Sequence, residues 1–333
     1  MTQENPTFSE HQRSVPFALK PIPLGEELEW KDVMVQRYAK ITDIATFKRY
    51  SLSFLRKSVR VNTLKTTVDA VKKSLGKEWD MVQVPWCKEG FWVQHRGGRL
   101  DIGNTVEHAL GQIYVQEAAS MIPPVVLDPQ PGELVLDLCA APGSKTTQIA
   151  QYMQNRGVLV ANDITADRLA SLGINLQRCG VVNDIITQMH GMRDVQFDRI
   201  LLDAPCSGTG TIRKSLKTLR TWSINATRKM CTAQRHLLRD VWPMLKKGGT
   251  LVYSTCSLEP EEDEGMVSEF LGRTPDADII PITLDIKHGP GITSWEGVDY
   301  DPRVKDTLRL WPQDNDTEGF FIAKITKVSR TAD

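Results

Sequence analysis

Short apolar runs alternate with longer segments of helical periodicity from Glu133 onward. The runs are Leu134–Leu138, Gly157–Asp163, Ile200–Leu202 and Leu251–Tyr253. The segments Ala166–Arg178 and Thr227–Trp242 lie between them and have the pattern of helices. Strands that alternate with helices are typical of a mainly parallel sheet covered on both faces. We therefore predict an α/β fold for this part of the chain.

The N-terminal third has a different organisation. Pro16, Pro21 and Pro23 discourage regular structure near the start of the chain. Farther along, Gln116–Ile122 has the pattern of a helix that leads into the large sheet. We divide the chain into an N-terminal arm over residues 1–30, a small α+β module over residues 31–106 and a larger α/β domain over residues 107–333.

Two cysteines follow directly on predicted strands. Cys206 lies in the segment DAPCSGTG after Ile200–Leu202, and Cys256 lies in YSTCS at the end of Leu251–Tyr253. In both places an apolar run changes into small, turn-forming residues, as at the end of a strand. Loops beyond the carboxyl ends of parallel strands form the ligand site of such folds. We therefore expect both thiols to face one site.

A third strand end has the features of a cofactor loop. After Leu134–Leu138 the small residues of Cys139–Thr146 precede a helix, so that backbone amides can approach a polar ligand closely. The next strand ends in Asp163, in the position where such folds bind a ribose. The loop is neither a G-x-G-x-x-G fingerprint nor a P-loop. This spacing predicts a cofactor that contains a nucleoside.

The chain resembles the RsmB/NOP (Nop/Sun) family of RNA cytosine-5 methyltransferases, which use S-adenosylmethionine, and within it the archaeal-type tRNA methyltransferases. The resemblance is carried by DLCAAPGSKTTQ (137–148), FDRILLDAPCSGTGTIRK (197–214), LVYSTCSLEPEEDE (251–264), TEGFFIAKI (317–325), SVRVNTLKTT (58–67) and YVQEAASMIPP (114–124). It implies a class I, Rossmann-like S-adenosylmethionine-dependent methyltransferase sheet with a smaller N-terminal RNA-binding module. It also implies that Gly319–Ile325 forms a terminal antiparallel strand.

Methylation of cytosine at C5 gives a chemical reason for two thiols. Cytosine C5 becomes nucleophilic when a thiolate adds at C6 and converts the ring into an enamine. The product is released only when the C5 proton is removed and the bond between C6 and sulfur breaks. By resemblance, Cys256 is the nucleophile and Cys206 assists the elimination. Asp203 would hydrogen-bond the N3/N4 edge of the cytosine.

The same resemblance assigns the cofactor site. The loop from Cys139 to Lys145 would surround the methionine part of S-adenosylmethionine, and Asp163 would bind the ribose hydroxyls. Where many relatives have an Asp that contacts the adenine amino group, this chain has His190, whose neutral imidazole nitrogen can accept the same hydrogen bond. The complete predicted cofactor site is Cys139, Ala140, Ala141, Pro142, Gly143, Ser144, Lys145, Asp163, Arg168, His190 and Asp203.

The charge distribution favours RNA as the partner. The formal net charge is zero, but residues 48–77 contain nine basic side chains and one acidic side chain. The basic residues are Lys48, Arg49, Arg56, Lys57, Arg60, Lys65, Lys72, Lys73 and Lys77. A second basic cluster, Arg213, Lys214, Lys217 and Arg220, follows the Cys206 loop. Both clusters are expected to neutralise phosphates.

Other kinds of site and location are disfavoured. The six cysteines have no C-x₂₋₄-C spacing, which argues against zinc. The acidic run Glu259–Glu264 precedes a helical pattern and is interpreted as the solvated first turn of a helix, not as a metal site. The chain has no apolar stretch near ~18 residues long and starts with a polar segment. We expect a cytoplasmic monomer.

The predicted function is the transfer of a methyl group from S-adenosylmethionine to cytosine C5 in RNA, with tRNA as the preferred substrate. A cytosine-5 methyltransferase of rRNA is one alternative. An RNA-binding assembly factor with weak catalysis is another, although the presence of Cys206, Cys256 and Asp203 argues against it. A DNA cytosine methyltransferase is disfavoured because its nucleophile would lie in the Pro-Cys loop and no Glu-Asn-Val motif is present.

Overall fold

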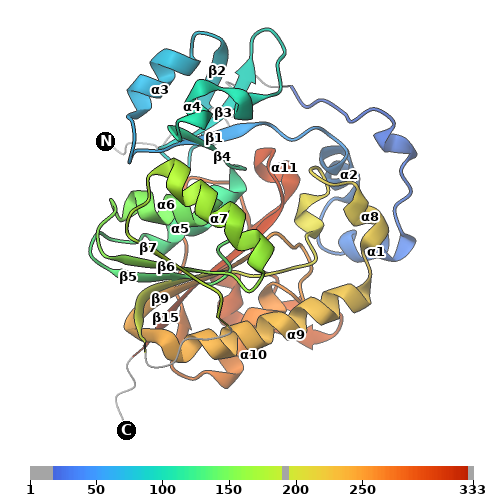
Figure 1. Cartoon of the computed structure of the whole chain (residues 1–333). Coiled ribbons are helices and arrows are strands. Elements are labelled where there is room, and N and C mark those ends of the chain that lie inside the picture. The colour runs from blue at the N-terminus through green and yellow to red at the C-terminus, as the bar shows by residue number, and fades with distance from the viewer. Residues whose placement is uncertain (1–17, 190–194, 329–333) are drawn as a thin grey trace, which may run out of the picture.

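The computed structural model describes residues 18–189 and 195–328. A large mixed sheet with helices on both faces forms the main body of the protein (Figure 1). A smaller antiparallel sheet lies over the helices of one face, and short N-terminal helices lie beside the large sheet. The predicted α/β class with a smaller N-terminal α+β module is confirmed.

The strands of the large sheet follow the order β11-β14-β15-β9-β8-β5-β6-β7, and β10 pairs with β15. Their bounds are β5 Leu134–Asp137, β6 Val158–Asn162, β7 Asp184–Thr187, β8 Phe197–Asp203, β9 Leu245–Thr255, β10 Ala277–Ile279, β11 Gly289–Pro290, β14 Leu308–Leu310 and β15 Phe320–Lys327. Pairing is parallel from β7 through β9, whereas β15 pairs with β9 in antiparallel register. The chain order reverses between β5 and β8, which is where folds of this type bind ligands.

Two helical layers cover the sheet because each helix buries one apolar face. Helices α5 (Ile122–Leu127), α6 (Ser144–Tyr152) and α7 (Ala166–Cys179) share one buried cluster with β5 and β6. Helices α9 (Ile224–Val241) and α10 (Glu264–Arg273) share a second cluster with β8 and β9. Figure 1 shows the two layers on opposite faces of the sheet. Helices α7 and α9 confirm the two long helices predicted from the sequence.

The smaller sheet has the order β2-β3-β1-β4, and all of its pairs are antiparallel. It is built from β1 (Ser58–Val61), β2 (Trp79–Gln83), β3 (Gly90–His95) and β4 (Ile113–Val115), with α3 (Val68–Leu75) and α4 (Val106–Ala109) alongside. Since β4 pairs with β1, the sheet extends beyond residue 106. The helix predicted over 116–122 begins later, with a 3₁₀ turn at Ala119–Met121 that continues into α5.

The N-terminal helices pack against the large domain. Helix α1 (Asp32–Tyr38) and α2 (Ile44–Ser51) bury Met34, Tyr38 and Phe47 in a cluster that includes Trp222 and Trp311. The remaining elements are α8 (Lys217–Thr221), α11 (Pro312–Asn315), β12 (Ser294–Trp295), β13 (Val298–Asp299) and 3₁₀ turns at Gly25–Glu27, Ile102–Asn104, Thr209–Thr211, Trp242–Met244 and Pro302–Asp306. Within the described ranges, every helix is too short or too polar to cross a membrane.

Candidate active site

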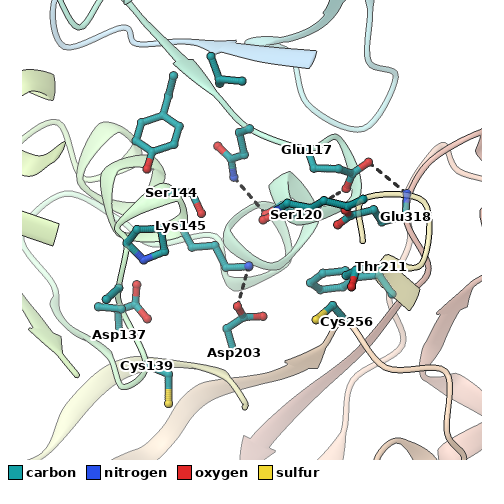
Figure 2. A pocket seen from close by; sticks show the side chains of 18 residues that line it. Glu117, Ser120, Asp137, Cys139, Ser144, Lys145, Asp203, Thr211, Cys256 and Glu318 are labelled. Atoms are coloured by element: carbon teal, nitrogen blue, oxygen red, sulfur yellow. Dashed lines mark hydrogen bonds and ion pairs between the residues drawn. The ribbon is translucent and has the colours of Figure 1, made fainter. Parts of the chain in front are cut away.

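A cavity of about 300 Å³ opens at the carboxyl ends of β5, β8 and β9 (Figure 2). Asp137 ends β5, Asp203 ends β8, and Cys256 directly follows β9, so the strand ends bring these three side chains to one site. The cofactor loop lines one part of the cavity. The predicted residues along its wall are Cys139, Ala140, Ala141, Pro142, Ser144, Lys145, Asp203 and Cys256.

The other described residues of the predicted site contact residues of this wall or belong to the same loop. Cys206 contacts Cys256, and Gly143 donates its amide to the Ala140 carbonyl at 2.8 Å. Asp163 and Arg168 both hydrogen-bond the backbone of Ala141. His190 lies outside the described residues. The structure therefore brings the described members of the predicted site together in one region.

The two thiols are in direct contact. The Sγ atoms of Cys206 and Cys256 are 3.1 Å apart, and both cysteines are free thiols. The hydrogen bond with Cys256, together with burial, raises the pKa of the Cys206 thiol well above its usual value. Cys206 therefore keeps its proton in this arrangement, and Cys256 is the sulfur exposed to the cavity.

Backbone hydrogen bonds hold three loops around these thiols. The amide of Gly210, in the Cys206 loop, donates to the Cys256 carbonyl at 2.9 Å. The amide of Gly319, which precedes β15, donates to the Gly210 carbonyl at 2.9 Å. A Cβ atom at Gly210 would lie 2.2 Å from the Gly319 carbonyl oxygen and 2.8 Å from the Cys256 carbonyl oxygen. Only glycine fits at this position because three backbones meet there.

Asp203 is held by two partners at the edge of the cavity. Its Oδ2 atom accepts a hydrogen bond from Lys145 Nζ at 2.7 Å, and its Oδ1 atom accepts one from Ser254 Oγ at 2.7 Å. Figure 2 shows the Lys145 side chain reaching from the cofactor loop to Asp203. Burial lowers the pKa of Lys145, but the Asp203 carboxylate outweighs this effect and the net pKa is raised. Lys145 is thus a cation paired with Asp203, a contact that its assignment to the cofactor loop did not predict.

The backbone of the cofactor loop is held in a fixed conformation. Gly143 begins α6 with a φ of 105°, a backbone conformation that L side chains rarely adopt. Asp163 is 2% exposed and fixes the loop by accepting the amides of Ala141 at 3.3 Å and Thr165 at 3.0 Å. Arg168 pairs with Asp163 at 3.2 Å.

The Asp137 side chain indicates whether the cavity can hold S-adenosylmethionine. Its Oδ2 atom accepts a hydrogen bond from Thr146 Oγ1 at 2.7 Å, whereas its buried Oδ1 atom has no hydrogen-bond partner among the described residues. Burial raises the pKa of Asp137 to about 7. A buried acceptor at the cavity wall is suited to the ammonium group of an amino acid. The residues present fit the expected cofactor.

Comparison with known proteins agrees with this geometry. Residues 124–326, more than half of the chain, match the family described as 16S rRNA methyltransferase RsmB/F. Residues 32–118 match the N-terminal domain of 16S rRNA methyltransferase RsmF. The chain belongs to the RsmB/F methyltransferase family. This membership confirms the predicted enzyme class, an RNA cytosine-C5 methyltransferase that depends on S-adenosylmethionine.

Individual relatives of this RsmB/F-family chain differ in substrate. It is 45% identical over 299 residues to the tRNA (cytosine(49)-C(5))-methyltransferase of Pyrococcus abyssi, covering 88% of this chain and 95% of that protein. It is 42% identical over 284 residues to ribosomal RNA small subunit methyltransferase F of Cronobacter sakazakii, covering 83% of this chain but only 58% of that protein. The crystal structure of a methyltransferase homolog from Pyrococcus horikoshii superposes with a TM-score of 0.82 at 38% identity, covering 92% of this chain and 98% of that one.

The acidic run of this RsmB/F-family chain is buried, so its interpretation as a solvated turn was wrong. Glu259, Glu262, Asp263 and Glu264 have no exposed surface. Buried carboxylates require partners from elsewhere. Arg309 pairs with Asp263 at 3.0 Å, while Glu262 accepts the Ser207 amide at 2.9 Å beside Cys206. The run therefore stabilises the catalytic loops. Within the described ranges, no group of three or more His, Cys, Asp or Glu side chains is arranged to hold a metal ion.

Three arginines expected to contact RNA are structural instead. Arg60 is fully buried and donates to Gln116 Oε1 at 2.9 Å and to Thr147 Oγ1 at 2.8 Å. The Arg56 side chain is 9% exposed, and the Arg213 side chain is 0% exposed; both pair with Asp316. A guanidinium in such a position cannot reach a phosphate. The basic residues with exposed side chains in the two clusters are Arg49, Lys57, Lys65, Lys72, Lys73, Lys77, Lys214, Lys217 and Arg220.

Two acidic residues of the cavity were missed. Glu117 and Glu318 line it close to Thr211 (Figure 2), and Lys214 lines the same cavity. Burial, followed by the Glu318 charge, raises the pKa of Glu117 to about 8. Both lie in segments that carry the family resemblance, 114–124 and 317–325. Neither lies at the carboxyl end of a predicted strand, so the argument from strand ends did not select them.

Proposed function

We propose that this chain methylates C5 of cytosine in RNA through a covalent bond between Cys256 Sγ and cytosine C6. The observation that carries the proposal is the contact between two free thiols, 3.1 Å apart, beside the Asp203–Lys145 pair. One thiol suffices for attack on C6, whereas a second group is needed for removal of the C5 proton. Cys256 at the cavity wall and Cys206 in contact with it supply both.

The reaction begins when the Cys256 thiolate adds to C6 of a cytosine whose N3/N4 edge faces Asp203. The Lys145 ammonium, 2.7 Å from Asp203, neutralises that carboxylate and supplies a proton toward N3 as electrons move into the ring. The addition leaves C5 nucleophilic. S-adenosylmethionine, held by Asp137, Asp163 and the loop from Cys139 to Lys145, supplies the electrophilic methyl group when bound.

Elimination then releases the product. A base removes the C5 proton, the C5–C6 double bond forms again, the bond from C6 to Cys256 breaks to return the thiolate, and N3 returns its proton to Lys145. The contact with Cys256 is the largest cause of the raised pKa of Cys206. Once Cys256 is bonded to C6, its sulfur is a neutral thioether, so the Cys206 thiol ionises more easily and gives its proton to solvent. Cys206 thus becomes a base at the step that needs one.

The preferred substrate in this proposal is tRNA. Identity is higher, and coverage of both chains more complete, with the tRNA methyltransferase of Pyrococcus abyssi than with the rRNA methyltransferase of Cronobacter sakazakii. Methylation of rRNA is the alternative. The proposal further takes the protein to act on RNA as a monomer in the cytoplasm. Light scattering of the purified protein, alone and with RNA, measures its oligomeric state.

The experiment compares Cys256→Ala, Cys206→Ala and the control Cys231→Ala, whose sulfur bonds the Glu261 carbonyl outside the cavity. Cys256→Ala should abolish methylation and covalent adducts. Cys206→Ala should attack but fail to eliminate, so that a protein–RNA complex resistant to denaturant accumulates. Cys231→Ala should do neither. Bisulfite sequencing of tRNA and rRNA from cells with and without the protein identifies the modified cytosine.

Each negative result has a specific meaning. The opposite trapping pattern would exchange the roles of Cys206 and Cys256. Methylation by both variants would exclude the covalent mechanism. RNA binding without methylation by the wild-type protein would support the assembly-factor alternative.

A further inference from the structure

A pair of carboxyl groups forms one side of the cavity and has no role in the reaction described above. Glu117 follows β4, and Glu318 precedes β15. Glu117 Oε2 accepts the amides of Ala119 at 2.6 Å and Ser120 at 3.1 Å, and Glu117 Oε1 accepts the amide of Glu318 at 3.3 Å. Glu117 therefore fixes the backbone of Glu318 relative to the segment that leaves the small sheet.

Glu318 has an acceptor that lacks a donor. The residue is 4% exposed and lines the cavity, yet its Oε1 atom is buried without a hydrogen-bond partner in the part of the chain that the structure describes. A buried carboxyl oxygen left without a partner is costly. Burial raises the pKa of Glu318, and the Lys214 and Lys145 charges offset this effect only in part. This side chain is arranged to accept a hydrogen bond from a ligand in the cavity.

The chemistry of a nucleotide within an RNA chain limits which donor the ligand can offer. The 3′ and 5′ oxygens of an internal cytidine are esterified, so its donors are the N4 amino group and the 2′-hydroxyl. The N4 group faces Asp203 in the proposed reaction. The 2′-hydroxyl is the remaining donor.

The geometry of the cytosine ring directs the ribose to the side of the cavity where Glu318 lies. C6 lies opposite N3 in the cytosine ring and next to N1, which carries the ribose. With C6 at Cys256 and N3 at Asp203, the ribose extends away from Asp203. In Figure 2, Asp203 lies on one side of Cys256, while Thr211 and Glu318 lie on the other. Lys214 also lines the cavity and is exposed, so it can contact a phosphate beside this ribose.

We propose that Glu318 accepts a hydrogen bond from the 2′-hydroxyl of the target cytidine and thereby selects RNA over DNA at the methylated position. Glu117 acts as a positioning residue because it holds the Glu318 backbone. This inference rests on the proposed function, which places cytosine against Cys256 and Asp203.

The test uses RNA hairpins that differ only in the 2′-hydroxyl of the target cytidine, with the single-turnover rate constant of methylation as the measurement. The wild-type protein should methylate the 2′-deoxy substrate about 10- to 100-fold more slowly, as expected when a buried acceptor is left without its hydrogen bond. Glu318→Ala should react slowly with both substrates and no longer distinguish them. Glu318→Gln keeps an acceptor oxygen of the same shape and should retain part of the preference. A hairpin with a 2′-deoxy residue at the next nucleotide is the control and should react normally.

Folding is checked by thermal melting and S-adenosylmethionine affinity, neither of which should change in Glu318→Gln. If Glu318→Ala does not fold, Glu318→Gln alone tests the inference. A folded Glu318→Gln protein whose ratio of rates on the two hairpins equals that of the wild-type protein overturns it. Equal rates of the wild-type protein on both substrates would also overturn it and leave the proposed function intact. A wild-type protein that methylates neither hairpin nor cellular RNA would instead refute the proposed function itself.

Discussion

Replacement of Arg309 by methionine tests whether the buried acidic run depends on a single cation. Arg309 donates to Glu264 Oε1 at 2.8 Å, to Asp263 Oδ2 at 3.0 Å and to the Leu258 carbonyl at 3.0 Å. The side chains of all three charged residues are at most 1% exposed. Methionine has a similar length but no charge. The substitution leaves two carboxylates in the interior without their cation.

The expected loss of stability is large because one partner of a buried ion pair is removed. Breaking such a pair costs about 3–5 kcal/mol of unfolding free energy. The control is Arg303→Met, whose partners are Asp301 at 2.7 Å and Asp278 at 3.3 Å and whose side chain is 39% exposed. Exposed pairs of this kind contribute about 0.2–1 kcal/mol. Urea denaturation at pH 7, followed by tryptophan fluorescence, measures both variants.

The pH dependence provides a second readout. Burial raises the pKa of Asp263 well above its usual value even with Arg309 present. The Arg309 charge lowers this pKa, so its removal raises the folded-state pKa further. The variant then takes up more protons on folding than the wild-type protein, and its extra loss of stability grows as pH rises above the unfolded pKa. The loss of unfolding free energy caused by Arg309→Met should therefore be smaller at pH 5 than at pH 7. Equal and small losses for Arg309→Met and Arg303→Met at both pH values would refute this account.

Three further predictions concern ligand binding. Asp163→Ala should weaken S-adenosylmethionine binding by about 1.5–3 kcal/mol in calorimetry, the range for hydrogen bonds to a charged group. Unchanged affinity would exclude a role for this carboxylate in cofactor binding. Because the pKa of Asp137 is raised to about 7, pairing with the ligand's ammonium should release about half a proton at pH 7, and binding should strengthen as pH rises through 7. Calorimetry in two buffers of different ionisation enthalpy measures this proton release, and Asp137→Asn should abolish it. Lys57→Glu with Lys65→Glu should weaken RNA binding and flatten its salt dependence while leaving S-adenosylmethionine affinity unchanged, and an unchanged salt slope would show that these side chains only face solvent.

The ends of the strands could be predicted from the sequence because they depend on local pattern. Apolar runs that stop at small residues indicated where Cys206, Cys256 and Asp203 lie, and parallel strands bring such positions together whatever the rest of the chain does. The loop from Cys139 to Lys145 followed from the same argument. These residues form or support one cavity in the structure.

The partners of charged residues could not be predicted in this way. Arg60 and Lys57 lie in the same basic segment, yet one is fully buried and the other is exposed. The difference arises because Arg60 lies within β1 and faces Gln116 and Thr147, which are distant in sequence. Burial of the acidic run likewise depends on Arg309, a contact across 46 residues from Asp263. Such contacts are decided by tertiary packing, which hydrophobic periodicity does not describe.

The meeting of three backbones at Gly210 affects how far the sequence of this site can diverge. The bonds that join the loops run from amide to carbonyl, between Gly210 and Cys256 and between Gly319 and Gly210. Such bonds do not depend on the side chains of the loops, so neighbouring positions can change during evolution while the two thiols keep their separation. Position 210 lacks this freedom, because any added carbon collides with two carbonyl oxygens. Among descendants of this chain, altered RNA specificity is therefore expected through changes in the side chains around the cavity, with the backbone that carries Cys206 and Cys256 left unchanged.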